Sequence, residues 1–338
     1  MRANFALRWD DLGDRPFVTI GREETGERFM AEHVFVLGGD GFVGSHIVRA
    51  CLKQGHVVTS FGPRMSTNLL ADLNGTVHRK DGCAEDGDAL LTALRESGAT
   101  RAVWAAGYNA DARGLMASGE LDAGRAVAVN VGAWTNMLRA ASQCGLKRVV
   151  ACGSTVVFGA STDYTGAVRE ISAQLPRSVY GMTKSLAEAA AQHHVRQTGL
   201  SVVTLRLPLV FGPGRWYGGA ATAIVELVQA AARQQSIDIR LTRESFDLMY
   251  VKDAANAVLR LLAADKVAAT YNVNGFATNH EEIVRTLQQL RPGFQPSTEY
   301  IAAPWTYPHM SSALIEQEQG FRPSYTLEAA LSDYLNEV

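Results

Sequence analysis

Short apolar segments alternate with helical patterns through the first half of this chain. Continuous runs of valine, phenylalanine and alanine are typical of parallel strands that are buried on both faces. Parallel strands need crossovers, which are nearly always right-handed, so the alternation predicts a doubly wound α/β fold on a parallel sheet. We expect strands at residues 34–37, 57–61, 76–78, 102–105, 148–151 and 202–207, and helices at 42–54, 88–97, 126–144 and 180–198.

A glycine-rich turn joins the first expected strand to the first expected helix. Glycines allow the backbone to turn tightly and to approach a pyrophosphate, whose negative charge the N-terminus of the following helix favours. A strand-to-helix turn that binds no ligand is the alternative. The residues expected to contact a dinucleotide here are Gly38, Gly41, Phe42, Val43 and Gly44.

Tyr180 and Lys184 are four residues apart in an expected helix, so their side chains share one face, with Cβ atoms about 6 Å apart. A phenol has a pKa of about 10, and its use as a proton carrier near neutral pH requires about 4 kcal/mol of phenolate stabilisation. A lysine ammonium about 5 Å away supplies about 3 kcal/mol at an effective dielectric constant of about 20. The spacing therefore predicts that Tyr180 is a general acid/base, although such pairs also occur by chance.

Ser154 follows the expected strand at 148–151. Ligands of open α/β sheets bind beyond the carboxyl ends of the strands. We therefore expect Ser154 to face the same crevice as the glycine turn and to hydrogen-bond a substrate oxygen. A serine that only satisfies the local backbone is the alternative.

Together these segments resemble the extended short-chain dehydrogenase/reductase superfamily, or NAD-dependent epimerase/dehydratase family, which contains sugar-nucleotide epimerases and dehydratases. The resemblance covers about residues 32 to 335. Further segments that match in family order are Val129-Asn-Val-Gly132, Leu205-Arg-Leu-Pro-Leu-Val-Phe-Gly-Pro213, Tyr250-Val-Lys-Asp-Ala-Ala-Asn-Ala257, Tyr271-Asn-Val273 and Gly320-Phe-Arg-Pro323.

The resemblance implies hydride transfer between a substrate carbon and nicotinamide C4. Tyr180 would exchange the hydroxyl proton, Lys184 would hold the nicotinamide ribose and lower the pKa of Tyr180, and Ser154 would orient the reacting oxygen. Asn130 would be a structural or proton-relay residue. The other implied cofactor contacts are Asp81, Gly82, Ala105, Ala106, Gly107, Asn130 and Pro208, together with Tyr180 and Lys184.

The regular alternation ends after residue 207. A turn-rich loop at 212–219 precedes an apolar helix at 220–233, and we expect a smaller, mostly helical lobe that closes over the substrate. The expected division is a dinucleotide-binding Rossmann domain at 31–207 with about 244–275, and a substrate-binding lobe at about 208–243 and 276–338. Residues 1–30 are an N-terminal extension or reflect a misassigned start codon, and 17–20 are expected to form a short edge strand.

The second strand ends without the acidic residue that commonly binds the ribose 2′-hydroxyl of NAD. Gly62 occupies that position, and Arg64 follows two residues later, where it can pair with a 2′-phosphate. This favours NADP over NAD. NAD stays open because Arg64 is nearly as well explained as a solvated loop residue, and because Asp40 would repel a phosphate if it faced the ribose.

Sugar-nucleotide members of the family carry Asn after the sixth strand and Arg before the Tyr-Val-x-Asp segment, where this chain has Leu209 and Phe246. A diphosphate without these donors is costly to bury. Arg215 or Arg243 could supply the missing donors, and simple solvation of both side chains is the alternative. The acidic pair that dehydratases use is also missing beside Ser154. We therefore expect a small polar or sugar-derived hydroxy compound. The candidate substrate contacts are Tyr108, Ser154, Thr155, Leu209, Arg215 and Phe246.

Three functions fit these observations. The favoured one is an NAD(P)-dependent dehydrogenase or reductase that acts on a small hydroxy or keto substrate. The second is a sugar epimerase, possibly of nucleotide sugars, that retains its cofactor. The third is a non-catalytic, cofactor-sensing regulator, which the intact Tyr180 and Lys184 pair disfavours.

Composition bears on the remaining classes. A net charge of −2 gives no electrostatic argument for nucleic acid or an anionic membrane, and no apolar run approaches the roughly 18 residues of a membrane span. Neither the cysteine spacing nor the adjacent His193 and His194, which diverge on a helix, suggests a metal site. Reduced cysteines in a cytoplasmic protein are expected. The four cysteines are Cys51, Cys83, Cys144 and Cys152.

The expected helices at 126–144 and 180–198 carry more small apolar residues than one core-facing stripe needs. Relatives pair these two helices across a two-fold axis, so we expect a homodimer. The alternative is that the alanines reflect helix propensity alone. They are Ala140, Ala141, Ala187, Ala189, Ala190 and Ala191.

Overall fold

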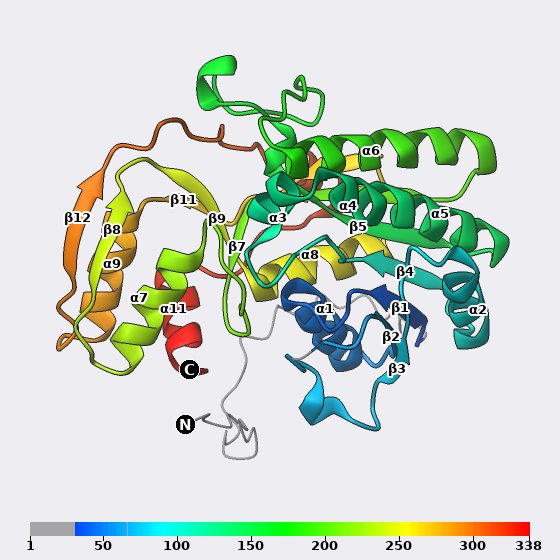
Figure 1. Ribbon diagram of the computed structural model, residues 1–338, viewed down its shortest axis with the longest axis horizontal. Helices are drawn as coiled ribbons and strands as arrows, with labels where there is room; N and C mark the ends of the chain where they lie inside the picture. The colour runs from blue at the N-terminus through cyan, green and yellow to red at the C-terminus, as the bar shows by residue number, and fades with distance from the viewer. Residues whose placement is uncertain (1–30, 66) are drawn as a thin grey trace. The chain divides into compact units, whose positions relative to one another are not determined.

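The computed structural model describes residues 31–65 and 67–338, which contain a seven-stranded parallel sheet (Figure 1). The strand order is β10-β6-β5-β4-β1-β2-β3, which confirms the doubly wound Rossmann-type fold. The order reverses beside β1, so the crevice at the carboxyl ends of β1 and β4 is the expected ligand site of such a sheet. The strands are β1 (His33–Leu37), β2 (Val57–Gly62), β3 (His78–Asp81), β4 (Arg101–Trp104), β5 (Arg148–Ser154), β6 (Val202–Leu207) and β10 (Thr270–Asn272).

Helices cover both faces of this sheet (Figure 1). Helices α1 (Phe42–Lys53) and α8 (Val251–Ala263) lie on one face, and α2 (Gly87–Ser97), α5 (Trp134–Gln143) and α6 (Val179–Thr198) lie on the other. Because side chains alternate along a strand, Val34 and Val36 of β1 enter the first core, while Phe35 and Leu37 enter the second. Each face therefore has its own apolar core.

Two expected elements differ in detail. The helix expected at 126–144 consists of α4 (Ala123–Val127), a π-helical segment η2 (Ala128–Ala133) and α5. The third strand lies at His78–Asp81 rather than 76–78, because this edge strand has the charged sequence His-Arg-Lys-Asp and offers no apolar run to locate it. Unexpected short helices are α3 (Leu115–Leu121), η1 (Ala71–Leu73), η3 (Thr155–Val157) and η4 (Ser161–Asp163).

The second half forms a lobe of helices and two small sheets. Its core contains Phe211, Leu227, Leu248, Ile283 and Leu331. One sheet has the order β11-β9-β7 and the other pairs β12 with β8. The strands are β7 (Leu209–Phe211), β8 (Asp238–Thr242), β9 (Phe246–Tyr250), β11 (Phe276–Thr278) and β12 (Ser297–Ile301), and the helices are α7 (Thr222–Ala232), α9 (His280–Leu290), α10 (Ala313–Gln319) and α11 (Leu327–Leu335). β9 thus belongs to the lobe sheet, whereas β10 completes the parallel sheet.

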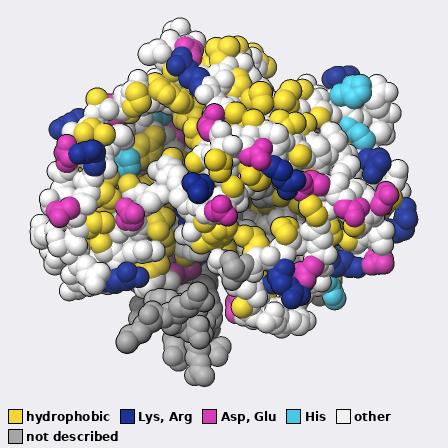
Figure 2. Space-filling model, in the orientation of Figure 1, with side chains coloured by type: hydrophobic (Ala, Val, Ile, Leu, Met, Phe, Trp, Pro, Cys, Tyr) yellow, Lys and Arg dark blue, Asp and Glu magenta, His cyan; other side chains and the backbone are white. Residues whose placement is uncertain are grey.

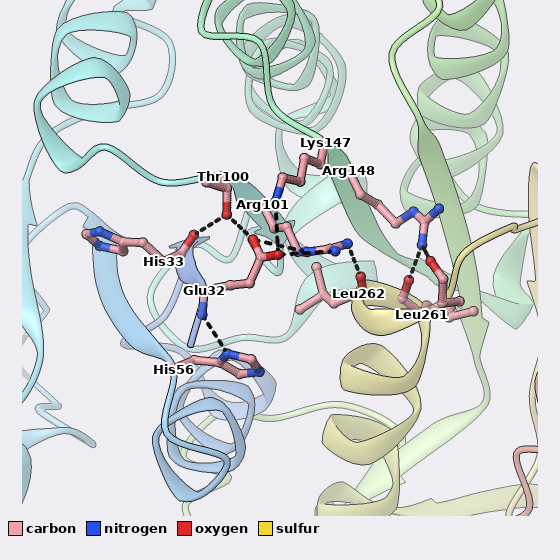
Figure 3. Close-up of polar contacts among 10 residues, drawn as sticks. Glu32, His33, His56, Thr100, Arg101, Lys147, Arg148, Leu261 and Leu262 are labelled. Atoms are coloured by element: carbon pink, nitrogen blue, oxygen red, sulfur yellow. Dashed lines mark hydrogen bonds and ion pairs between the residues drawn. The ribbon is translucent and has the colours of Figure 1, made fainter. Parts of the chain in front are cut away.

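A polar network fixes the amino ends of the central strands (Figure 3). Glu32 accepts hydrogen bonds from Thr100, Lys147 and Arg101. Burial alone would raise the pKa of Glu32, but these hydrogen bonds and the charge of Arg101 outweigh it and lower the pKa to about 2. Arg148 donates to the carbonyl oxygen of Leu261 at 3.0 Å, near the C-terminus of α8, where a cation is favourable. The network ties α8 to this edge of the sheet.

The expected N-terminal extension and its strand at 17–20 lie outside the described residues. Among the helices that the structure describes, none has the length and hydropathy of a bilayer-spanning segment. Within the same residues, no group of three or more His, Cys, Asp or Glu side chains is placed to hold a metal ion. The four cysteines, all within the described part of the chain, are free thiols.

Candidate active site

The glycine turn lies at the carboxyl end of β1. Gly38 has a φ of +82°, and a Cβ added there would lie 2.8 Å from the backbone nitrogen of Ala106. A Cβ on Gly44 would lie 2.0 Å from the carbonyl oxygen of Gly38. No described side chain caps α1 at Gly41, so the first amides of the helix are open to a ligand. This cradle fits a pyrophosphate, as the sequence predicts.

Ser154, Tyr180 and Lys184 meet at the carboxyl end of β5. Ser154 is the last residue of β5, and the other two lie in the first two turns of α6. Ser154 lies close enough to Tyr180 for its hydroxyl to lower the pKa of the phenol. The Lys184 Nζ donates to the carbonyl oxygen of Cys152 at 2.8 Å and lies 5.6 Å from the centroid of the Tyr180 ring. Ser154 Oγ also accepts a long bond from the Val156 amide at 3.4 Å, so it has a local backbone contact as well.

Burial controls the ionisation of this group. Burial raises the pKa of Tyr180, with further increases from Tyr217 and Cys152, and the Ser154 hydroxyl offsets only part of the rise. Burial likewise lowers the pKa of Lys184. The phenol therefore keeps its proton at neutral pH in the protein alone. The lowering expected from Lys184 is not among the main contributions to the pKa of Tyr180.

Asn130 connects the segment after β4 with α6. Its Oδ1 accepts from the Tyr108 amide at 2.8 Å, and its Nδ2 donates to Thr183 Oγ1 at 3.0 Å. Thr183 Oγ1 in turn donates to the carbonyl oxygen of Tyr180. These contacts give Asn130 a structural function between Tyr108 and α6. The segment between β4 and Tyr108 contains the other predicted cofactor contacts Ala105, Ala106 and Gly107, of which Ala106 lies against Gly38.

The two charged residues expected to bear on the choice between NAD and NADP, Arg64 and Asp40, are each paired with an oppositely charged side chain. Arg64 Nη2 lies 2.8 Å from Asp81 Oδ2, and both side chains are exposed. Asp40 is only 6% exposed and pairs with Arg79 of β3 at 2.7 Å. The Asp40 carboxylate is therefore in an ion pair with Arg79 and is not an unpaired charge in the glycine turn. Gly62 has room for a side chain, because the nearest atom to an added Cβ is the Gly38 nitrogen at 3.9 Å.

The predicted substrate residues fall into two groups. Leu209 and Phe246 pack against the lobe core, and Phe246 lies 4.9 Å from the ring of His280. Arg215 lies in the loop after β7 and stacks on Tyr217 at 4.3 Å. The remaining candidates lie at the ends of strands of the parallel sheet: Tyr108 follows β4, Ser154 is the last residue of β5, and Thr155 comes next. The predicted cofactor contact Pro208 follows β6.

Two tyrosines near Tyr180 escape the sequence patterns. Tyr217 and Tyr307 both raise the pKa of Tyr180, so the loop after β7 and the segment after β12 both contribute to the surroundings of Tyr180. Tyr307 packs on Trp305 at 4.7 Å, and its segment is held where Ser161 N donates to the carbonyl oxygen of Thr306. No sequence pattern links Tyr217 or Tyr307 to Tyr180, because they are far apart along the chain. The one feature that could have drawn attention to them is an aromatic pair in a turn-rich loop.

Cavities alone do not locate this site. A cavity of about 620 Å³ opens on the lobe between β11, α9 and α11, and includes none of the predicted residues. A space of about 10 Å³, enough for roughly one water molecule, lies between Lys184 and Glu188. The chemistry of the side chains at the carboxyl edge is therefore the better guide.

A sequence model of the NAD dependent epimerase/dehydratase family matches residues 34–274. The chain belongs to this family, and with it to the NAD-dependent enzymes of the extended short-chain dehydrogenase/reductase type.

Relatives within this class are distant and diverse. An uncharacterized epimerase/dehydratase of Staphylococcus saprophyticus is 26% identical over 222 residues, 62% of this chain and 68% of that protein. The mitochondrial L-threonine 3-dehydrogenase of Sus scrofa is 26% identical over 247 residues, 70% of this chain and 65% of that enzyme, just under two thirds of its length. The UDP-glucose 4-epimerase of Thermotoga maritima, solved with UDP-glucose, has a TM-score of 0.80 at 19% identity and covers 90% of this chain and 98% of its own. Likeness at that identity establishes the fold alone.

Proposed function

We propose that this protein is an NAD(P)-dependent oxidoreductase that transfers a hydride at a hydroxyl or keto carbon of a small polar or sugar-derived substrate. The observation that supports it best is the meeting of Ser154, Tyr180 and Lys184 at the carboxyl edge that also carries the glycine turn. Residues 31–207 with about 244–275 would hold the dinucleotide, and about 208–243 with 276–338 would contact the substrate.

Each residue has a defined task in this proposal. The bound dinucleotide supplies or accepts the hydride at nicotinamide C4. Tyr180, which burial keeps protonated, donates its proton to the carbonyl oxygen during reduction and takes it back during oxidation. Ser154 fixes that oxygen through its hydroxyl. The Lys184 ammonium, 5.6 Å from the Tyr180 ring, favours the phenolate when the proton has left.

The cofactor preference stays a prediction in favour of NADP. It is supported by the open space at Gly62 and by the pairing of Asp40 with Arg79, which sets a positive counter-charge beside the carboxylate that argued against a phosphate. An exposed pair such as Arg64 with Asp81 is worth about 0–1 kcal/mol, so Arg64 can exchange Asp81 for a 2′-phosphate at little cost.

A second candidate is a sugar epimerase that retains its cofactor. It is favoured by the burial of Tyr180 to 7% exposure, since an enclosed site slows the loss of a bound group. Cofactor that stays with the protein through gel filtration, and turnover without net change in nicotinamide absorbance, would select this candidate.

We also propose a homodimer, in the cytoplasm, through the helical segment at 126–144 (the end of α4, η2 and α5) and α6. Figure 2 shows hydrophobic side chains gathered over α3, α4 and the start of α6. Val127, Met182 and Leu186 are 38%, 38% and 44% exposed. Of the alanines expected at the interface, Ala140, Ala141 and Ala191 are buried within the chain's own core, and Ala187 and Ala190 pack against it, which leaves Ala189 exposed. Light scattering that reports a monomer at micromolar concentration would contradict this proposal.

The function is tested by cofactor titration followed by a substrate screen. Calorimetry should show saturable binding of NADP or NAD, and a screen of sugar acids, aldoses and hydroxy acids should show a change in nicotinamide absorbance. Failure to bind either dinucleotide would refute the assignment. Binding without turnover on any of these classes would refute the substrate class alone.

A further inference from the structure

Arg215 presents a partly buried guanidinium that has no acidic partner among the described residues. Its Nη1 donates to the Tyr217 hydroxyl at 3.3 Å and its Nη2 to the Gly218 carbonyl oxygen at 3.5 Å, both long contacts. Its Nε is buried and has no hydrogen-bond partner within the described part of the chain. A guanidinium carries five N–H donors, and a buried charge without a counter-charge is destabilising. The guanidinium therefore has N–H donors that could bind an anion.

The position of Arg215 indicates which ligands can reach it. Its Cζ lies 5.7 Å from the ring centroid of Phe42, the first residue of α1, and 4.3 Å from that of Tyr217. The loop is fixed against α1, because the carbonyl oxygen of Pro213 lies 3.0 Å from the Nε2 of His46. Arg215 thus lies beside the helix start whose amides are open to a pyrophosphate.

The same loop also faces the catalytic tyrosine. Tyr217, which Arg215 both stacks on and hydrogen-bonds, packs on Phe42 at 6.3 Å and is close enough to Tyr180 to raise its pKa. The neighbouring Trp216 keeps its indole N–H buried without an acceptor among the described residues. Arg215 and Tyr217 therefore lie between the cofactor turn and the reacting group.

We propose that Arg215, with Tyr217 and the start of α1, forms an oxyanion-binding subsite for a phosphate or carboxylate group. The subsite rests on the proposed function, because its place is defined by the glycine turn and Tyr180. Two sources supply such a group: the pyrophosphate of the dinucleotide and an anionic group on the substrate. In the second case the substrate is an acidic hydroxy compound rather than a neutral sugar, and Arg215 takes over the anion contact that Leu209 and Phe246 cannot make.

Binding measurements without turnover separate the two sources. ADP and adenosine share base and ribose and differ in the pyrophosphate, so both are titrated into the full-length wild type and the Arg215→Met variant by calorimetry. If Arg215 meets the pyrophosphate, the variant binds ADP about 10-fold or more weakly and binds adenosine unchanged. If Arg215 serves the substrate, ADP affinity is unchanged. The NAD-saturated wild type then binds inorganic phosphate or malonate, and the variant does not.

Arg243→Met is the matched control. Arg243 also stacks on a tyrosine, with its Cζ 5.2 Å from the Tyr300 ring centroid. It directly follows β8, which pairs with β12 in the lobe, so its substitution should leave every titration unchanged. Arg215→Lys keeps the charge and should retain part of the anion affinity. It replaces the methionine variant if that variant does not reproduce the wild-type circular dichroism and melting temperature.

The proposal is overturned if folded Arg215 variants bind ADP, inorganic phosphate and malonate as the wild type does, or if the effect on ADP also appears for adenosine. A wild type that binds no ADP and no dinucleotide would instead refute the cofactor assignment. In that case the phosphate and malonate titrations of the unliganded protein decide the subsite independently.

Discussion

The polar groups at the two edges of the parallel sheet, where the strands begin and where they end, differ in how completely they are hydrogen-bonded. At the amino edge, the Glu32 carboxylate is hydrogen-bonded by three side chains, and Arg148 donates to backbone carbonyls near the end of α8 (Figure 3). At the carboxyl edge, the Nε of Arg215, the Nε1 of Trp216 and the hydroxyl oxygen of Tyr307 are buried without hydrogen-bond partners among the described residues.

This difference separates stability from function within one sheet. A satisfied network of charges lowers the free energy of the folded state, and removal of a member leaves the others unpaired. Unsatisfied buried donors cost stability and are retained where a ligand completes them. Substitutions at the amino edge should therefore change melting and leave catalysis intact, whereas substitutions at the carboxyl edge should do the reverse.

The largest effect is expected at Tyr180. Tyr180→Phe removes the proton donor but keeps the ring, so turnover should fall by about 10²-fold or more, while cofactor affinity and melting temperature stay close to the wild type. Steady-state kinetics and calorimetry on the same preparation check this. A variant that turns over like the wild type would show that Tyr180 is not the acid/base.

Gly44→Ala tests the cradle at the same edge. Its Cβ would lie 2.0 Å from the Gly38 carbonyl oxygen, so the start of α1 must move. Overpacking of this kind costs about 1–3 kcal/mol, which corresponds to about 10–100-fold in dinucleotide affinity if the strain falls on the binding site. Gly62→Ala is the control, since its Cβ meets nothing closer than 3.9 Å. Equal dinucleotide affinity of the two variants would contradict the assigned cradle.

Glu32→Gln tests the amino edge. Hydrogen bonds to a charged group contribute about 1.5–3 kcal/mol, so the free energy of unfolding should fall by about that amount while kcat and KM do not change. Glu96→Gln, in an exposed pair with Lys80, is the control and should have almost no effect. A change in catalysis as large as the change in stability would mean that the two edges are not independent.

The pH dependence of this contribution has a definite sign. The folded state lowers the pKa of Glu32 from 4.5 to about 2, so its stabilisation is fully present above pH 4.5 and is lost as the pH falls towards 2. The difference in unfolding free energy between wild type and Glu32→Gln should therefore be constant above pH 4.5 and shrink below it. Denaturant titrations across this range measure it, and a difference that grows on acidification would refute the assignment.

Periodicity and spacing were sufficient for the parallel sheet, the glycine turn and the pair Tyr180 and Lys184. All three depend on residues that are close together in sequence or on buried apolar runs. The predicted position of β3 was wrong because an edge strand can be charged and gives no apolar run. The strands β7 and β11 of the lobe and β10 of the parallel sheet were not predicted because they have only three residues each. Tyr217 and Tyr307 could not be assigned, since only the tertiary fold brings their loops to Tyr180.

The smallest effect, and the finest test of the carboxyl edge, concerns cofactor choice. Gly62→Asp places a carboxylate at the end of β2, where it can accept from a ribose 2′-hydroxyl and repel a 2′-phosphate. The preference should shift towards NAD by about 10-fold, the worth of one charge-assisted hydrogen bond at a partly exposed site. The affinity ratio of NADP to NAD, measured by calorimetry for wild type, Gly62→Asp and Gly62→Ala, reports the shift. Because Asp40 already pairs with Arg79, it should not determine this ratio in the wild type. A strong preference of the wild type for NAD would overturn that reasoning, and would mean that the pairing of Arg64 with Asp81 persists when the cofactor binds.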